Sequence, residues 1–211
     1  MIFDHLVVVA PDLGEGLAHV RECLGIDLPG GGRHREMGTR NHLLRLGDAT
    51  FLEVIAVDPD AAPPSRARWF GLSNAQRVRA DWEAGRRLRG FVARTQDLDG
   101  VLATHGPLLG VPTSVSRGTL AWRFSLRPDG EWPAEGAVPC VIDWGPRGNP
   151  ADAMPELGAR LVDLTLAHPD PAGIRRCHAA LGLDMDLRIV LGESLRFTAR
   201  VDTPDGVRTL T

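Results

Sequence analysis

One pattern occurs nearly three times in this chain: a short apolar strand, a polar turn containing Asp, and a Leu-bearing helix. The three copies cover residues 3–26, 89–111 and 161–183. A repeated unit of this kind cannot bury its apolar face alone and must pack against its neighbours. The repeat therefore predicts a fold assembled from similar modules, and it identifies the residues that occupy equivalent positions.

The first module is predicted to be a strand and a helix followed by antiparallel strands. Ile2–Ala10 is an apolar run rich in β-branched residues, which is typical of a buried strand. Asp12 occupies a helix N-cap position and Gly25 ends the helix. Two strand candidates, Asn41–Arg45 and Thr50–Val57, follow after a glycine-rich loop.

The second module repeats this order. We expect a strand at Leu88–Thr95, a helix at Leu98–His105, and strands at Thr119–Leu126 and Val138–Trp144. The intervening polar segments, rich in Pro and Gly, are predicted to be loops.

The third module is predicted to be partial, because the chain stops soon after its helix. Its strand is expected at Arg160–His168, its helix starts at Pro171, and three short strands follow. We interpret it as mainly structural, covering a sheet edge or forming a dimer interface.

These modules define the expected domain organisation. Modules 1–58 and 88–147 form one domain, 1–147, and an amphipathic linker helix near 69–87 joins them. Residues 159–211 form the third, partial module.

Composition excludes several classes of function. The net charge of −3 gives no basic field for nucleic acid, so no nucleic-acid partner is expected. No apolar run approaches membrane-spanning length and no leader pattern precedes the first strand, so we expect a cytoplasmic protein without membrane contact. The three cysteines have no paired spacing and are predicted to be free thiols.

Chemistry is indicated by residues at equivalent positions. When the modules are aligned on their strand-to-helix turns, His5 matches Gly90. When the last strands are aligned, Glu53 matches Asp143, and each ends an apolar run. A carboxylate in such a run is costly unless it is paired, hydrogen-bonded or bound to a metal.

One histidine and two carboxylates suit a divalent ion such as Zn²⁺, Fe²⁺, Mn²⁺ or Ni²⁺. Simpler interpretations stay open for each residue. His5 could be a hydrogen-bonded strand histidine, and Glu53 could pair with Arg45 across a hairpin. Asp143 could cap a strand end beside Trp144.

The stretches DHLVVVAPDL, GGRHREMGTRNHLLRLGDATFLEVIAV and PCVIDWG occur in this order and spacing. In them the chain resembles the glyoxalase-like branch of the glyoxalase, or vicinal oxygen chelate, superfamily. The resemblance implies an α+β fold in which βαβββ modules pair into a cupped mixed β-sheet, with the third partial module appended. It also implies metal ligands on the first and last strand of each module. His5, Glu53 and Asp143 fall on three of these positions.

The fourth ligand position is Gly90, which has no side chain to bind a metal. Two alternatives follow: a three-ligand metal site, or a degraded site in a protein that binds its ligand without metal.

Further candidates for substrate binding follow the glycine-rich loop and lie in a later strand. His34, Arg40 and Asn41 lie near the expected mouth of the cup, and Asn41 is the predicted inward residue of its strand. Of Trp122 and Arg123 only one can face inwards: Trp122 as an apolar wall, or Arg123 as an anchor for a carboxylate or phosphate.

The predicted function is that of a bacterial glyoxalase-like enzyme, a homodimer that binds a small oxygen-rich molecule in the cup. A divalent metal would act as a Lewis acid in a lyase, isomerase or dioxygenase reaction, as the resemblance implies. Without metal, Glu53 would act as a general base. The alternative is a non-catalytic protein of the same fold that sequesters a small molecule or drug.

Overall fold

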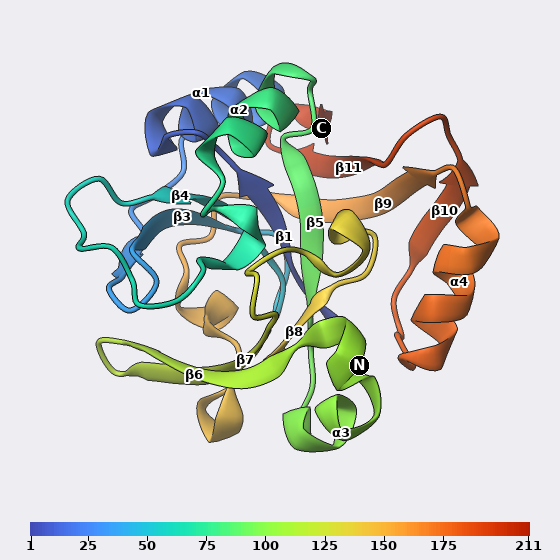
Figure 1. The fold of residues 1–211 in the computed structure, drawn as a ribbon. Coiled ribbons are helices and arrows are strands. Elements are labelled where there is room, and N and C mark those ends of the chain that lie inside the picture. Colours follow the sequence, from blue (N-terminus) through green and yellow to red (C-terminus); the bar gives the residue numbers. More distant parts are fainter.

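The computed structural model describes residues 1–211 and contains two β-sheets (Figure 1). The larger sheet has eight strands in the order β2-β3-β4-β1-β5-β8-β7-β6 and curves into a cup. The smaller has four strands in the order β10-β9-β11-β12. The α+β class and the cupped mixed sheet expected from the sequence are confirmed.

Module one supplies half of the cup. Its elements are β1 (Ile2–Val9), α1 (Leu13–Leu24), β2 (Gly32–His34), β3 (Thr39–Arg45) and β4 (Phe51–Val57). The Asp12 carboxylate accepts a hydrogen bond from the Glu15 N–H, and Gly25 ends the helix at φ 72°. Side chains of β4 alternate, so Phe51, Glu53 and Ile55 face the concave side of the cup.

Module two supplies the other half. Its elements are β5 (Leu88–Arg94), α3 (Leu98–Leu109), β6 (Val111–Arg117), β7 (Leu120–Leu126) and β8 (Cys140–Asp143). The sequence did not predict β6, and α3 continues past the expected end at His105 through Pro107.

The two modules are related by a pseudo-twofold axis. β1 and β5 are antiparallel, and each pairs in parallel with the last strand of its own module. His5 pairs with Val92, and Val7 pairs with Gly90. Each strand has one unpaired bulge residue, Asp4 in β1 and Arg89 in β5, and aligning the two bulges makes His5 equivalent to Gly90, as the sequence alignment predicted.

The linker between the modules contains a short helix rather than one long one. A 3₁₀ turn at Trp69–Gly71 precedes α2 (Ala75–Glu83). Phe70 has φ 60°, so the backbone turns sharply there and both aromatic side chains of the turn enter the cup. Further 3₁₀ turns cover Pro133–Gly136, Gly145–Arg147 and Pro150–Ala153.

The third segment contains β9 (Arg160–His168), α4 (Pro171–Ala180), β10 (Leu187–Leu191), β11 (Arg196–Thr203) and β12 (Gly206–Leu210). Its element order is that of the other modules, but its strand pairing differs. The first strand, β9, lies between β10 and β11, whereas β1 and β5 pair with the fourth strand of their modules. All four strands are present in a sheet of their own.

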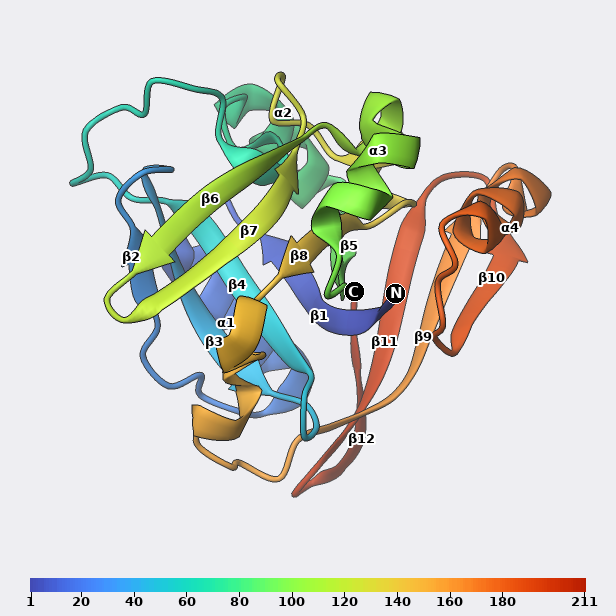
Figure 2. The same ribbon diagram turned by 90° about the horizontal axis from the view of Figure 1, so that it is seen from below.

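The second sheet lies against the outside of the cup (Figure 2). Leu164, Leu166 and Phe197 share one buried cluster with Leu6 of β1 and Phe91 of β5. The third segment therefore covers the convex face of the larger sheet and not one of its edges. No helix of the chain is both long and apolar enough to span a bilayer.

Candidate functional site

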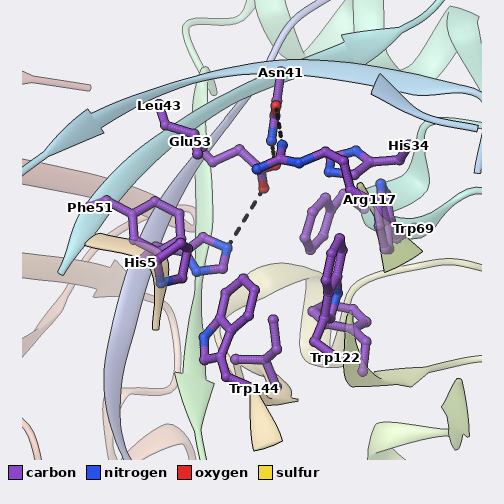
Figure 3. Close-up of a pocket in the computed structure, with 14 residues that line it drawn as sticks. His5, His34, Asn41, Leu43, Phe51, Glu53, Trp69, Arg117, Trp122 and Trp144 are labelled. Carbon is purple, nitrogen blue, oxygen red and sulfur yellow. Dashed lines mark hydrogen bonds and ion pairs between the residues drawn. The ribbon is translucent and has the colours of Figure 1, made fainter. Parts of the chain in front are cut away.

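A cavity opens on the concave face of the cup (Figure 3). It encloses about 430 Å³ of empty space, including its open mouth. Its lining residues come from both modules and the linker: His5, His34, Asn41, Leu43, Phe51, Glu53, Trp69, Phe70, Arg117, Trp122, Phe124, Ile142, Trp144 and Pro150.

Glu53 is a buried carboxylate with two polar neighbours. Its Oε1 accepts a 2.6 Å hydrogen bond from Asn41 Nδ2, and its Oε2 lies 3.6 Å from His5 Nε2. Asn41 lies on β3, which pairs with β4, so the strand pairing itself places the amide beside the carboxylate. These contacts offset the cost of burying a charge in an apolar strand.

His5 is held from its other side by Asp4. Its Nδ1 donates to Asp4 Oδ1 over 2.6 Å, which requires the proton on Nδ1 and directs Nε2 toward Glu53. The pairing of β1 with β5 shifts register between Phe3 and His5, which leaves Asp4 as an extra residue. This β-bulge explains how adjacent residues can contact each other through their side chains. The His5 ring also stacks on Phe51, with centroids 4.4 Å apart.

Asp4 is fully buried, and its carboxylate accepts several hydrogen bonds. Besides His5 it accepts from Asn149 Nδ2 at 2.7 Å and from Trp144 Nε1 at 3.0 Å. Arg94 Nη1 lies 3.4 Å away. Asp4 thus connects His5 to the segment that carries Trp144, one wall of the cavity.

The charges of His5 and Glu53 stabilise each other. Burial alone would lower the pKa of His5, but the hydrogen bond that it donates to Asp4 and the neighbouring Glu53 raise it to about 9. Burial alone would raise the pKa of Glu53, but His5 and Asn41 lower it below its ordinary value. At neutral pH the two form a buried imidazolium–carboxylate pair.

His34 stays neutral beside them. Burial lowers its pKa to about 4, and Arg117 adds to this effect. Its Nδ1 lies 3.1 Å from the Thr39 hydroxyl, and its ring makes edge contacts with Trp69 and Trp122.

Arg117 brings a positive charge to the cavity from the last residue of β6. Its Nη1 donates to Asn41 Oδ1 at 3.1 Å, an oxygen that also accepts from the Gly32 N–H. Arg117 forms no ion pair with any carboxylate of the chain. The rest of the wall is mainly aromatic, and Trp122 and Trp144 also border a wider groove outside the cavity.

Comparison with known proteins identifies the family. The model of the glyoxalase-like domain matches residues 3–182. The chain belongs to the glyoxalase-like domain family. Its fold is that of the glyoxalase, or vicinal oxygen chelate, superfamily.

A hypothetical protein from Staphylococcus aureus shares the fold of this glyoxalase-like domain at 13% identity and a TM-score of 0.62, covering 92% of this chain and 87% of that chain. Methylmalonyl-CoA epimerase of Streptomyces coelicolor matches at 15% identity and a TM-score of 0.42, over 70% of this chain and 96% of its own. The epimerase of Mycobacterium tuberculosis matches at 18% and 0.39, over 68% and 87%. No curated protein matches the chain.

Four of the predicted site residues beside Glu53 line the cavity of the glyoxalase-like domain: His5, His34, Asn41 and Trp122. The predicted inward direction of Asn41 is what the structure shows. Of the pair on β7, Trp122 faces inwards, and Arg123 points to the outer face, where it forms a bidentate pair with Asp99 of α3.

Asp143 and Arg40 lie elsewhere. In the strand register Val7 pairs with Glu53 and Val92 pairs with Cys140, so Cys140 is the equivalent of Glu53. The sequence alignment placed Asp143 there, three residues too far along. Ile142 faces the cavity, and alternation directs Asp143 away, where its Oδ1 accepts from the Gly145 N–H. Arg40 alternates with Asn41 and borders a separate surface depression with His42.

The donor set of this domain does not fit a divalent ion held by three or four side chains. Among the cavity residues, His5 and Glu53 are the only two possible ligands that contact each other, and the chain has no group of three His, Cys, Asp or Glu residues that could hold a metal ion. The amide oxygen of Asn41 already accepts two hydrogen bonds. At the equivalent positions of module two stand Gly90 and a buried thiol, Cys140.

Sequence reasoning missed Asp4, Arg117 and the aromatic turn at Trp69. Arg117 has a weak signal: Thr113, Val115 and Arg117 alternate with exposed residues, which is typical of a strand with one buried face. Asp4 had none, because a bulge is not visible in the apolar pattern.

Proposed function

We propose that this glyoxalase-like domain binds a small oxygen-bearing molecule in the cup and transfers a proton to and from it through Glu53 and His5. The observation that carries the proposal is the buried pair itself, a carboxylate and an imidazole that both border an apolar cavity. Pockets of this kind, mostly apolar with a few convergent polar groups, are where ligands bind.

The chemistry follows from the charges of the pair. The Glu53 carboxylate would accept a proton from a carbon acid next to a carbonyl group. The His5 imidazolium would stabilise the oxyanion that forms as the proton leaves. Returning the proton to another atom or face gives an isomerase or epimerase reaction, and loss of a leaving group gives a lyase reaction. Asp4 would hold His5 in the orientation that this requires.

Hydrogen–deuterium exchange tests this proposal with a panel of simple compounds and does not require the true substrate. Carbonyl compounds with an acidic α-C–H are incubated with the protein in D₂O, and loss of the proton signal is followed by NMR. We expect exchange in at least one compound with the native protein and none with Glu53→Gln. Exchange that persists in Glu53→Gln would contradict the assignment of the base.

A non-catalytic binder of the same fold is the competing function. The narrow inner cavity with aromatic walls supports it, since such walls hold a ligand without any proton transfer. Compounds that bind to the native protein with no exchange, and bind equally well to Glu53→Gln, would establish this alternative.

Metal assistance, expected from the sequence, is a further hypothesis for the same cavity. The carboxylate behind His5 favours it, because metal-bound histidines commonly donate their other N–H to a carboxylate. The presence of only two side-chain ligands counts against it. The expected homodimer also stays a prediction, which sedimentation analysis would test.

A further inference from the structure

The cavity contains a positive charge that no carboxylate of the chain neutralises. Arg117 is the one arginine among its lining residues, and it forms no ion pair. Many other arginines of the chain do pair with acids, including Arg123 with Asp99 and Arg79 with Glu15.

Asn41 keeps Arg117 apart from the one carboxylate in the cavity. The amide oxygen accepts from Arg117 and the amide nitrogen donates to Glu53, so the chain of contacts runs Arg117–Asn41–Glu53 (Figure 3). Glu53 in turn faces His5 at 3.6 Å. The negative charge of Glu53 is therefore matched by His5, and the charge of Arg117 is left over.

A second hydrogen-bond donor among the residues that line the cavity, the indole N–H of Trp69, has no acceptor. Trp69 lines the cavity, is 4% exposed, and its indole Nε1–H is buried without a hydrogen-bond partner. A buried N–H without a partner costs free energy that a ligand oxygen would recover. His34 lines the same cavity, in edge contact with Trp69.

We propose that the cavity binds the carboxylate group of a small monocarboxylic acid, anchored by Arg117. This inference rests on the proposed function and specifies its ligand class. One negative charge balances one unmatched guanidinium, and a planar carboxylate can accept two parallel N–H bonds from it.

The rest of the ligand has room only in one direction. Trp122 and Trp144 border both the inner cavity and the wider groove outside it. An apolar body would lie against these two rings, whose centroids are 5.4 Å apart, with the carboxylate inside. The acids that fit therefore carry a short apolar or planar chain.

Calorimetric titration with matched acids and amides tests the inference. The probes are isobutyrate and benzoate, each beside its neutral amide, and methyl phosphate as a second anion. We expect each acid to bind the native protein at least about tenfold more tightly than its amide, because a charge-assisted hydrogen bond is stronger than a neutral one. Arg117→Gln should abolish this preference and Arg117→Lys should keep part of it.

Arg35→Gln is the matched control. Arg35 is exposed on the turn between β2 and β3 and forms no ion pair, so its removal changes the net charge equally without touching the cavity. We expect this variant to retain the preference for acids. Equal loss in both variants would mean a general field effect and would overturn the role of Arg117.

Other results of the titration would contradict the carboxylate anchor at Arg117 without contradicting proton transfer through Glu53 and His5. Acids and amides that bind equally, both weakened by Trp122→Leu, would overturn the carboxylate anchor and leave the cavity as the binding site. Tighter binding of methyl phosphate than of the acids would overturn the ligand class. Absence of binding by either acid at millimolar concentration would also overturn it, whereas the deuterium exchange of carbonyl compounds decides the proposed function independently.

Discussion

The two halves of the cup have the same order of strands and helix, but they carry different side chains at equivalent positions. In module one, His5 and Glu53 occupy neighbouring strands and face the cavity. At the equivalent positions module two has Gly90 and Cys140. The His5–Glu53 pair thus has no counterpart in module two, whose polar contribution to the cavity is Arg117 of β6.

In module two, aromatic rings occupy the place of the missing side chains. A Cβ atom on Gly90 would lie 2.9 Å from the ring of Trp132, and that ring stacks on Phe70 with centroids 4.5 Å apart. Burial raises the pKa of Cys140 well above its ordinary range, so it stays a neutral thiol. In this duplicated framework the same two positions therefore carry the His5–Glu53 pair in one module and serve packing in the other.

The largest expected effect is on the rate of deuterium exchange when Glu53 is replaced, compared with replacement of its equivalent, Cys140. Glu53→Gln should reduce deuterium exchange by about 10²-fold or more, because removal of a general base costs that much. Cys140→Ala, at the same position of the other module, should leave the rate within about threefold once folding is confirmed. Exchange kinetics measured by NMR on both variants decide this. Equal losses would mean that the two halves are not functionally different.

Between about pH 6 and 9, the pH dependence of stability should come mainly from His5 of module one. The pKa of His5 is raised to about 9 by Asp4 and Glu53, so its stabilising contribution is present below about pH 6.5 and is lost as the pH rises through 9. The shift corresponds to about 3 kcal/mol of unfolding free energy.

Urea denaturation at about pH 6 and about pH 10, with His5→Gln as the control, measures this effect. The native protein should lose stability across this interval and the variant should lose much less. A variant with the same pH dependence as the native protein would exclude His5 as its source.

Gly90→Ala should destabilise the protein by about 1–3 kcal/mol, because the new methyl group meets the Trp132 ring. Gly90 does not have a positive φ, so the backbone itself would accept alanine. The same substitution in a Trp132→Leu background should cost less, since the obstructing ring is gone. Equal costs in both backgrounds, measured by urea denaturation, would show that Trp132 is not the reason for glycine here.

The sequence repeat was enough to predict one of the two residue equivalences between the modules. The spacing of the strand-to-helix turns was enough to match His5 with Gly90, because Asp12 and Asp97 cap their helices in the same way. The match of Glu53 with Asp143 was wrong in register. Asp143 ends β8, whereas Glu53 is the third residue of β4, and strand pairing, which the sequence does not display, places Cys140 opposite Val92.

Other features depend on contacts between distant segments. Alternation showed that only one of Trp122 and Arg123 could face inwards, but the choice depends on Asp99 of α3, which pairs with Arg123 outside. Asp4 sits inside an apolar strand and turns to His5 only because of a bulge. The third segment has the same order of elements as the other modules. Its sheet differs because β9 lies between β10 and β11, and the sequence does not display this strand order.

The smallest expected effect concerns metal. Because module two places no ligating side chain in the cavity lining, His5 and Glu53 are the only contacting pair available there, and we expect no tight site for a divalent ion. A ligand at 100 times its dissociation constant would stabilise the fold by about 2.7 kcal/mol. We expect Mn²⁺ or Ni²⁺ to leave the midpoint of thermal unfolding unchanged, and chelation to leave deuterium exchange unchanged. About one metal ion per chain in elemental analysis of the purified protein, lost in both His5→Ala and Glu53→Ala, would contradict this. It would mean that two ligands from a single module suffice, with the substrate or water completing the coordination.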